Sequence, residues 1–203
     1  MLGLPRSTEV NRRIAKEKLY ANVSLTSQVR DIIKEQIESV VWRNKLADST
    51  IGVSPGEAVT EIQVFEVHLR QRDLDKRVLT AIAKAIPYKI LFVLRFGDEA
   101  QAWIEVSSTF YRTDWLPLNK LTLRFEGLNL DAIYDNLARQ IAGGRLGKEG
   151  DIDEAVDRDR ERQKLEREIA ALEKKVSREK QFNRQVELNS ELRRLRVELE
   201  GTL

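Results

Sequence analysis

The chain has 203 residues, of which 41% are hydrophobic and 33% charged, and its formal net charge is +2. This apolar content suffices for one core of ordinary size, and the near-neutral balance excludes a strong global field for a polyanionic partner. The sequence contains no cysteine, which excludes disulfides, thiolate catalysis and cysteine-based metal sites. No apolar run has the length of a signal peptide or membrane span, so we expect a cytoplasmic protein with no membrane contact.

The N-terminal segment is predicted to be an arm or a short helix. Ser7 or Thr8 can cap this helix, and Val10, Ile14 and Leu19 fall on one of its faces. Basic residues surround this face and are candidate phosphate contacts.

The middle of the chain alternates between two hydrophobic periodicities. Apolar residues at helical spacing predict helices over residues 27–39, 74–86 and 130–142. Alternating or continuous runs rich in β-branched and aromatic residues predict strands over residues 40–46, 61–69, 90–96 and 101–106, with a weaker edge strand within 115–125.

This order predicts an α/β or α+β domain over residues 1–145, with a mixed sheet of four to five strands and flanking helices. Residues 146–152 contain two glycines and little to pack, which is typical of a linker. Residues 153–203 are predicted to form a long C-terminal amphipathic helix that resembles a coiled coil.

The C-terminal segment has no proline or glycine from Asp153 to Leu199 and contains two apolar runs spaced four, three and four residues apart. The runs are Leu165, Ile169, Leu172 and Val176, then Leu188, Leu192, Leu195 and Leu199. The second run is offset by two heptad positions from the first, more than the drift of a straight helix explains. Either one helix changes its apolar face, or an antiparallel hairpin turns near Ser177–Gln181. The missing glycine and proline favour the single helix.

We interpret these eight residues as helix-packing positions, used for self-association or for docking onto a partner. Phe182 and Val186 lie between the two runs among more varied side chains. They either pack back onto the α/β domain or across a dimer, or they form a docking surface for a partner protein.

The order of elements resembles the core of restriction-endonuclease-like nucleases, in which an acid on one strand and an acid-x-Lys pair on the next hold Mg²⁺. Here Asp48 and Glu66 would supply the acids, but His68 or Arg70 would have to replace the lysine, and both are poor substitutes. His68 is the only histidine, and we expect it to be structural. No phosphate-binding glycine motif occurs. We therefore predict no catalytic residue, metal site or cofactor.

Arg12, Arg13 and Lys16 are the candidate nucleic-acid contacts, because phosphate binding requires clustered positive charge. Glu9 and Glu17 dilute this cluster, which favours a solvated surface over a binding site.

Three segments carry a family resemblance: LGLPRSTEVNRRIAKEKLY, IPYKILFVLRFGD and SREKQFNRQVELNSELRRL. Together they resemble a bacterial family of unknown function whose members are encoded near helicase and DNA-methyltransferase genes in restriction-like phage-defence loci. The resemblance implies a setting in DNA metabolism or defence and a helicase-like ATPase as partner. It carries over no catalytic residue.

The composition, the two apolar runs of the C-terminal segment and the family resemblance together predict a non-catalytic accessory or assembly subunit of a bacterial DNA-processing or phage-defence complex. It would dock through its C-terminal helix and work in a homo- or hetero-oligomer. The alternative is a DNA-binding module or a restriction-endonuclease-like nuclease, including a degenerate one.

Overall fold

The computed structural model describes residues 2–15 and 26–201, which divide into two compact units, Met1–Gly144 and Arg145–Leu203. The described part of the first unit contains one seven-stranded sheet. Its strands are β1 (Glu9–Ile14), β2 (Ile37–Leu46), β3 (Ile62–Leu69), β4 (Lys89–Phe96), β5 (Glu99–Val106), β6 (Thr109–Arg112) and β7 (Leu116–Pro117).

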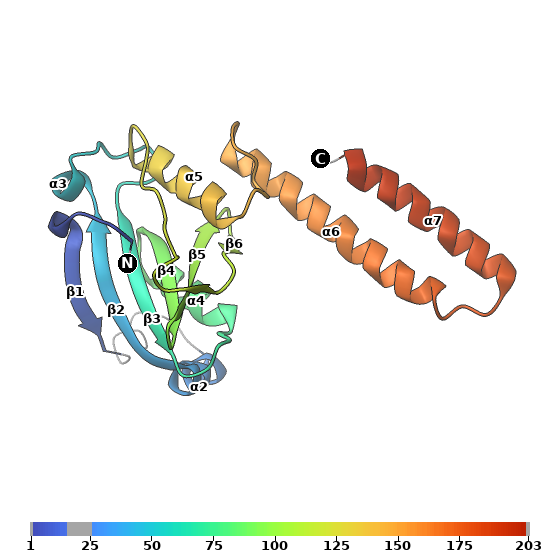
Figure 1. The fold of residues 1–203 in the computed structure, drawn as a ribbon, viewed down its shortest axis with the longest axis horizontal. Helices are drawn as coiled ribbons and strands as arrows, with labels where there is room; N and C mark the ends of the chain where they lie inside the picture. Colours follow the sequence, from blue (N-terminus) through green and yellow to red (C-terminus); the bar gives the residue numbers. More distant parts are fainter. Residues whose placement is uncertain (1, 16–25, 202–203) are drawn as a thin grey trace. The chain divides into compact units, whose positions relative to one another are not determined.

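The sheet is mixed, with six strands in the sequence order β1 to β6 and β7 paired to β5 (Figure 1). Only β3 and β4 run parallel; the other pairs are antiparallel. The parallel pair needs a crossover, and helix α4 (Lys76–Ala85) supplies it. The mixed sheet with flanking helices confirms the predicted class, whereas the predicted four to five strands were too few.

One face of the sheet packs on α2 (Ser27–Gln36) and α4. Along β3 the side chains alternate, so that Phe65, Val67 and Leu69 join the buried cluster shared with these two helices. Helix α5 (Leu130–Ile141) lies along β5 and β6 and contributes no residue to that cluster, so it covers the other face (Figure 1). Even-numbered β3 residues, Glu66 among them, therefore point away from α2 and α4.

The helices begin where side chains can accept the free amide groups of the first turn. Thr26, Asp75 and Asn129 cap α2, α4 and α5 in this way. Helix α2 ends at Gln36, three residues earlier than predicted, because Ile37 starts β2 and is fully buried. A short helix, α3 (Asp48–Ile51), stands in the predicted surface loop.

The prediction of an N-terminal helix is wrong. A 3-10 turn, η1 (Arg6–Thr8), leads into β1, which pairs antiparallel with β2 at the sheet edge. Within β1, Ile14 packs against the buried cluster while its arginines stay exposed, so tertiary pairing overrides the weak local pattern. Leu19 lies outside the described residues.

The far side of the sheet also differs from the prediction. Strand β6 forms a hairpin with β5 through Ser107 and Ser108, both with positive φ, and was not predicted. The expected edge strand within residues 115–125 shrinks to the two residues of β7. Four- and two-residue strands are too short to show an alternation in sequence.

The second unit is a helical hairpin of α6 (Ile152–Val176) and α7 (Phe182–Gly201). The favoured single continuous helix is thus corrected: the chain turns at residues 177–181, and the two helices pack against each other (Figure 1). The side chain of Glu179 accepts hydrogen bonds from the amides of Lys180 and Gln181, which satisfies two backbone donors at this turn.

Within the described residues, no helix combines the length and apolar character that crossing a membrane requires.

Candidate functional site

A buried charge network on the sheet is centred on Glu66, the middle residue of β3 by position and only 1% exposed. Three neighbouring groups bind its carboxylate. Arg43 Nε lies 2.8 Å from Oε2, while Arg95 Nη1 and His68 Nε2 lie 3.1 and 2.7 Å from Oε1. The network therefore joins β2, β3 and β4 through side chains as well as through backbone hydrogen bonds.

A bulge in β2 directs Arg43 toward Glu66. Trp42 pairs with Phe65 and Asn44 with Val64, so the register shifts by one residue and Arg43 is left unpaired. An extra residue of this kind re-aims a side chain. Because of it, the successive residues Arg43 and Asn44 both line the same cavity.

Asn11 of β1 connects this network to the sheet edge. Its Oδ1 accepts from Arg43 Nη1 at 3.0 Å, and its Nδ2 donates to Glu9 Oε2 at 3.0 Å. The backbone of Asn11 has φ +48°, a left-handed conformation that asparagine tolerates better than most residues, and the register of β1 is irregular between Glu9 and Arg12. Irregularities in two adjacent strands thus meet at one place.

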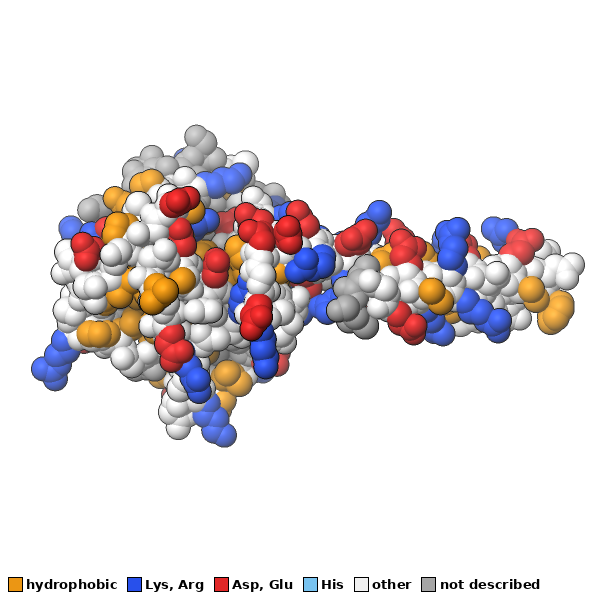
Figure 2. All heavy atoms as spheres, turned by 90° about the horizontal axis from the view of Figure 1, so that it is seen from above, with side chains coloured by type: hydrophobic (Ala, Val, Ile, Leu, Met, Phe, Trp, Pro, Cys, Tyr) orange, Lys and Arg blue, Asp and Glu red, His pale blue; other side chains and the backbone are white. Residues whose placement is uncertain are grey.

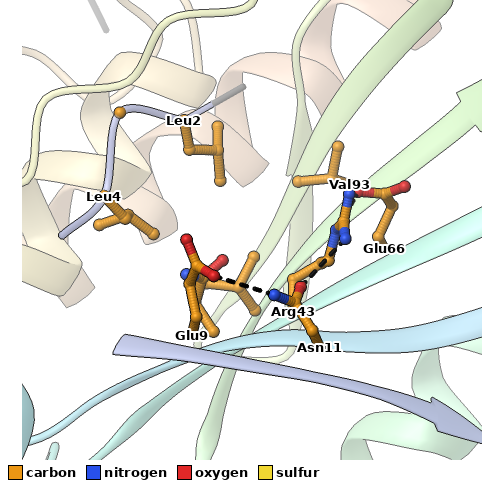
Figure 3. A pocket seen from close by; sticks show the side chains of 10 residues that line it. Leu2, Leu4, Glu9, Asn11, Arg43, Glu66 and Val93 are labelled. Atoms are coloured by element: carbon orange, nitrogen blue, oxygen red, sulfur yellow. Dashed lines mark hydrogen bonds and ion pairs between the residues drawn. The ribbon is translucent and has the colours of Figure 1, made fainter. Parts of the chain in front are cut away.

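The network forms one wall of a cavity of about 260 Å³ (Figure 3). Leu2 and Leu4 of the N-terminal segment lie on one side, and Glu9, Asn11 and Arg43 lie on the other, near the strands (Figure 3). Toward the sheet the lining is mostly polar, with Val64 and Val93 as its apolar members, and toward the N-terminus it is apolar.

Burial raises the pKa of Glu66, but hydrogen bonds from Arg43 and Arg95 and the charges of Arg43 and His68 outweigh it, so the pKa lies below its ordinary value. The carboxylate is therefore ionised at neutral pH. Both of its oxygens are held by cationic partners, which leaves it poorly suited to bind Mg²⁺ or to take up a proton as a base.

The depressed pKa predicts a pH dependence. A carboxyl group with a lower pKa in the folded state stabilises the fold above its ordinary pKa, 4.5 for glutamate, and loses that contribution as the pH falls toward the folded value. We expect the free energy of unfolding, measured by urea titration at each pH, to drop below about pH 4.5. Glu66→Gln should flatten part of this acid limb; an unchanged limb would contradict the assignment.

The structure separates the residues of the nuclease alternative. Glu66 and His68 come together, but Asp48 starts α3 and does not line the cavity, and Arg70 Nε donates to the backbone oxygen of Ile37 at 3.3 Å. Among the described residues, no three His, Asp or Glu side chains form a group that could hold a metal ion. The sequence did not predict Arg43 and Asn11 as site residues, because both lie at strand irregularities that no sequence pattern indicates.

The candidate nucleic-acid contacts on β1 do not form one patch. Arg12 pairs across from Trp42 and Arg13 across from Val41, so their side chains leave opposite faces of the edge strand. Both are exposed. Lys16 lies outside the described residues.

The two predicted apolar runs of the second unit meet each other inside the hairpin. Leu165, Ile169, Leu172, Leu188, Leu192 and Leu195 form one buried cluster, and Val176 and Leu199 pack against it. An ion pair across the hairpin, Arg196 Nη2 to Glu173 Oε1 at 2.7 Å, lies beside it. We call this cluster the hairpin seam; the packing partner of each run is the other run.

Phe182 and Val186 lie outside the seam, with 75% and 52% of their surfaces exposed, and Val197 is 69% exposed. Val186 precedes Leu195 by nine residues, and Val197 follows Leu188 by nine, which is half a revolution at 100° per residue. These three residues therefore form an outer face of α7 that points away from α6. Acidic and basic side chains surround apolar side chains on the surface of the hairpin (Figure 2).

Comparison with protein families matches residues 2–199 to a family described as "Domain of unknown function (DUF4391)". The chain belongs to this family, and the match spans nearly its whole length. Comparison with curated proteins and with solved structures finds no match.

Proposed function

We propose that this member of the DUF4391 family is a non-catalytic accessory subunit that docks onto a larger protein through the outer face of α7. The observation that carries the proposal is the exposure of Phe182, Val186 and Val197 on one side of a helix whose other side is already packed. The chain has few other large apolar side chains in the open: Tyr88, Phe96 and Leu128 complete the exposed set among the described residues.

The shape of this face favours a groove on a partner protein. Phe182 and Val197 lie fifteen residues apart, about 22 Å along the helix axis. One aromatic and two valines on a single helix bury too little surface for a stable homodimer. Helices with a few apolar anchors on one face characteristically insert into an apolar groove, and an aromatic anchor contributes most there.

The charge network on the sheet of the first unit supports the non-catalytic part of this proposal. Glu66 is neutralised by Arg43 and Arg95, so it joins strands and does not offer a free carboxylate for catalysis. The DNA-processing or phage-defence setting, and a helicase-like ATPase as the protein bound, extend the proposal from the family resemblance of the three sequence segments above.

The test is a binding measurement with a helicase-like ATPase, the partner that the family resemblance implies. The full chain should bind it, and Phe182→Asp with Val186→Asp should weaken the affinity at least tenfold, because two charges would enter an apolar groove. Leu128→Asp is the matched control: Leu128 is 97% exposed and lies in the other unit, so the same chemical change there should leave binding intact.

Unchanged affinity of the double variant would contradict the proposal, as would a wild-type chain that does not bind. Light scattering supplies a further outcome. If the wild-type chain has twice the mass of 23.4 kDa and the double variant is a monomer, the outer face belongs to a second copy of the chain, and docking onto a different protein is wrong.

A further inference from the structure

The turn end of the hairpin concentrates positive charge. Residues 174–184 contain five basic side chains and one acidic side chain, Glu179, in a chain whose net charge is only +2. The basic residues are Lys174, Lys175, Arg178, Lys180 and Arg184. We call these five residues the tip cluster.

Most of this charge is uncompensated. Earlier on α6, Arg158, Arg160 and Lys164 pair with acids of their own helix. In the tip cluster only Arg184 has such a partner, Glu187 at 2.8 Å, and the other four side chains make no ion pair with a described residue. Glu179 can offset only one of these four charges, and its carboxylate also accepts hydrogen bonds from two backbone amides of the turn.

Helix stabilisation explains only part of the tip cluster. Lys174 and Lys175 lie in the last turn of α6, where cations interact favourably with the helix dipole. Arg184 lies in the first turn of α7 and Lys180 lies two residues before the helix begins; near this end the dipole favours anions and a cation is unfavourable. Placing basic residues on both sides of the turn therefore serves something other than the two helices.

Four members of the tip cluster line a single open groove. Lys174, Lys175 and Arg178 come from α6 and the turn, and Arg184 comes from α7. The rest of the lining is apolar at Ala171, Leu172 and Leu188 and acidic at Glu179 and Glu191. Cations from two helices along one groove suit an extended anion with several charges better than a small one with a single charge.

We propose that the tip cluster binds the phosphate backbone of a nucleic acid. Phosphate contact requires only clustered, solvent-accessible Lys and Arg side chains, and it carries no base specificity. The tip cluster includes no residue of the outer face of α7, so this site goes beyond the proposed docking function and does not depend on it.

The experiment measures fluorescence anisotropy of a labelled single strand and a labelled duplex with the full chain, over a series of salt concentrations. Lys174→Gln, Lys175→Gln and Arg178→Gln combined should weaken binding at least tenfold at low salt. The slope of log affinity against log salt should fall by about 2 to 3 for the duplex, at about 0.9 per lost phosphate contact. Comparing the two probes shows which form of nucleic acid the site prefers.

The matched control removes the same number of charges from the same helix, as Arg158→Gln, Arg160→Gln and Lys164→Gln. It should change the affinity less than twofold, because these cations are already paired. Far-ultraviolet circular dichroism verifies that both variants keep the hairpin. Equal losses in the two variants, no binding by the wild-type chain at low salt, or equally tight binding of a polyglutamate peptide would overturn the proposal.

Discussion

Replacing Glu66 by leucine is expected to lower the free energy of unfolding of residues 1–144 by about 3 kcal/mol. Removing one member of a buried ion network leaves the others without compensation, and such losses typically reach about 3–5 kcal/mol. We expect a loss at the lower end of this range because the side chain of Arg43 is 40% exposed and can turn toward water. The side chain of Arg95 is only 23% exposed and has less freedom to do so.

Urea unfolding, followed by tryptophan fluorescence, measures this loss of stability in the first structural unit. Trp42, Trp103 and Trp115 are the three tryptophans of the chain, and all belong to the first unit. Glu66→Gln should cost less than Glu66→Leu, because the amide keeps a hydrogen-bond acceptor for one arginine. Glu99→Gln is the matched control: it removes an exposed pair with Arg72, which is worth at most about 1 kcal/mol.

A triple variant separates the effect of the charges from the effect of packing. If the penalty comes from uncompensated arginines, adding Arg95→Leu and Arg43→Leu to Glu66→Leu should recover part of the lost stability, since apolar replacement of a whole buried network is often neutral. A further loss on adding them would show that the aliphatic parts of the arginines matter more than their charges, contrary to this account.

The central elements of the fold were predictable because their side-chain pattern reports burial directly. Helices α4 and α5 each bury a regular face, and strands β3 to β5 are buried along most of their length. The helical spacing of Val78, Leu79 and Ile82 and the apolar run that contains Phe92 and Leu94 are therefore visible in the sequence. Strands β1 and β6 were not, because an edge strand has one neighbour and needs few apolar residues.

The sequence singled out two members of the charge network, Glu66 and His68, but only as residues of the nuclease alternative. The two arginines that bind Glu66 reach it through the β2 bulge and through the parallel register of β3 and β4, in which His68 lies beside Arg95. Both are properties of pairing between distant segments. The hairpin was also within reach of the sequence: the leucine spacing located both apolar runs, and the hairpin alternative placed the turn near Ser177–Gln181, but the missing glycine and proline favoured a single helix.

The hairpin seam gives the second large prediction: Leu172→Asp should unfold α6 and α7 while the first unit keeps its structure. Leu172 is buried among the seam residues of both helices. Truncating a buried leucine costs about 2–5 kcal/mol, and a buried charge costs more. Most of the stability of a helix in a protein comes from packing of its apolar face, so the hairpin has little reserve once the seam is disrupted.

Two spectroscopic signals distinguish the units in this experiment. The helical signal at 222 nm should fall, because the 45 residues of α6 and α7 contribute much of it, while tryptophan fluorescence and its urea midpoint stay unchanged. Val197→Asp is the matched control, an apolar-to-acid change on the exposed side of α7, the other helix of the hairpin, and it should leave both signals intact.

The outcome also decides how the outer face can act. If Leu172→Asp removes partner binding and Val197→Asp leaves the hairpin folded, then docking requires the folded hairpin, and a loss of binding by Val197→Asp reports direct contact. If Leu172→Asp unfolds the hairpin yet partner binding persists, the partner contacts the first unit, and the seam serves only to hold the hairpin together. Retention of the full helical signal by Leu172→Asp would contradict the seam itself, because an aspartate buried among the other, apolar seam residues has no partner to offset its desolvation.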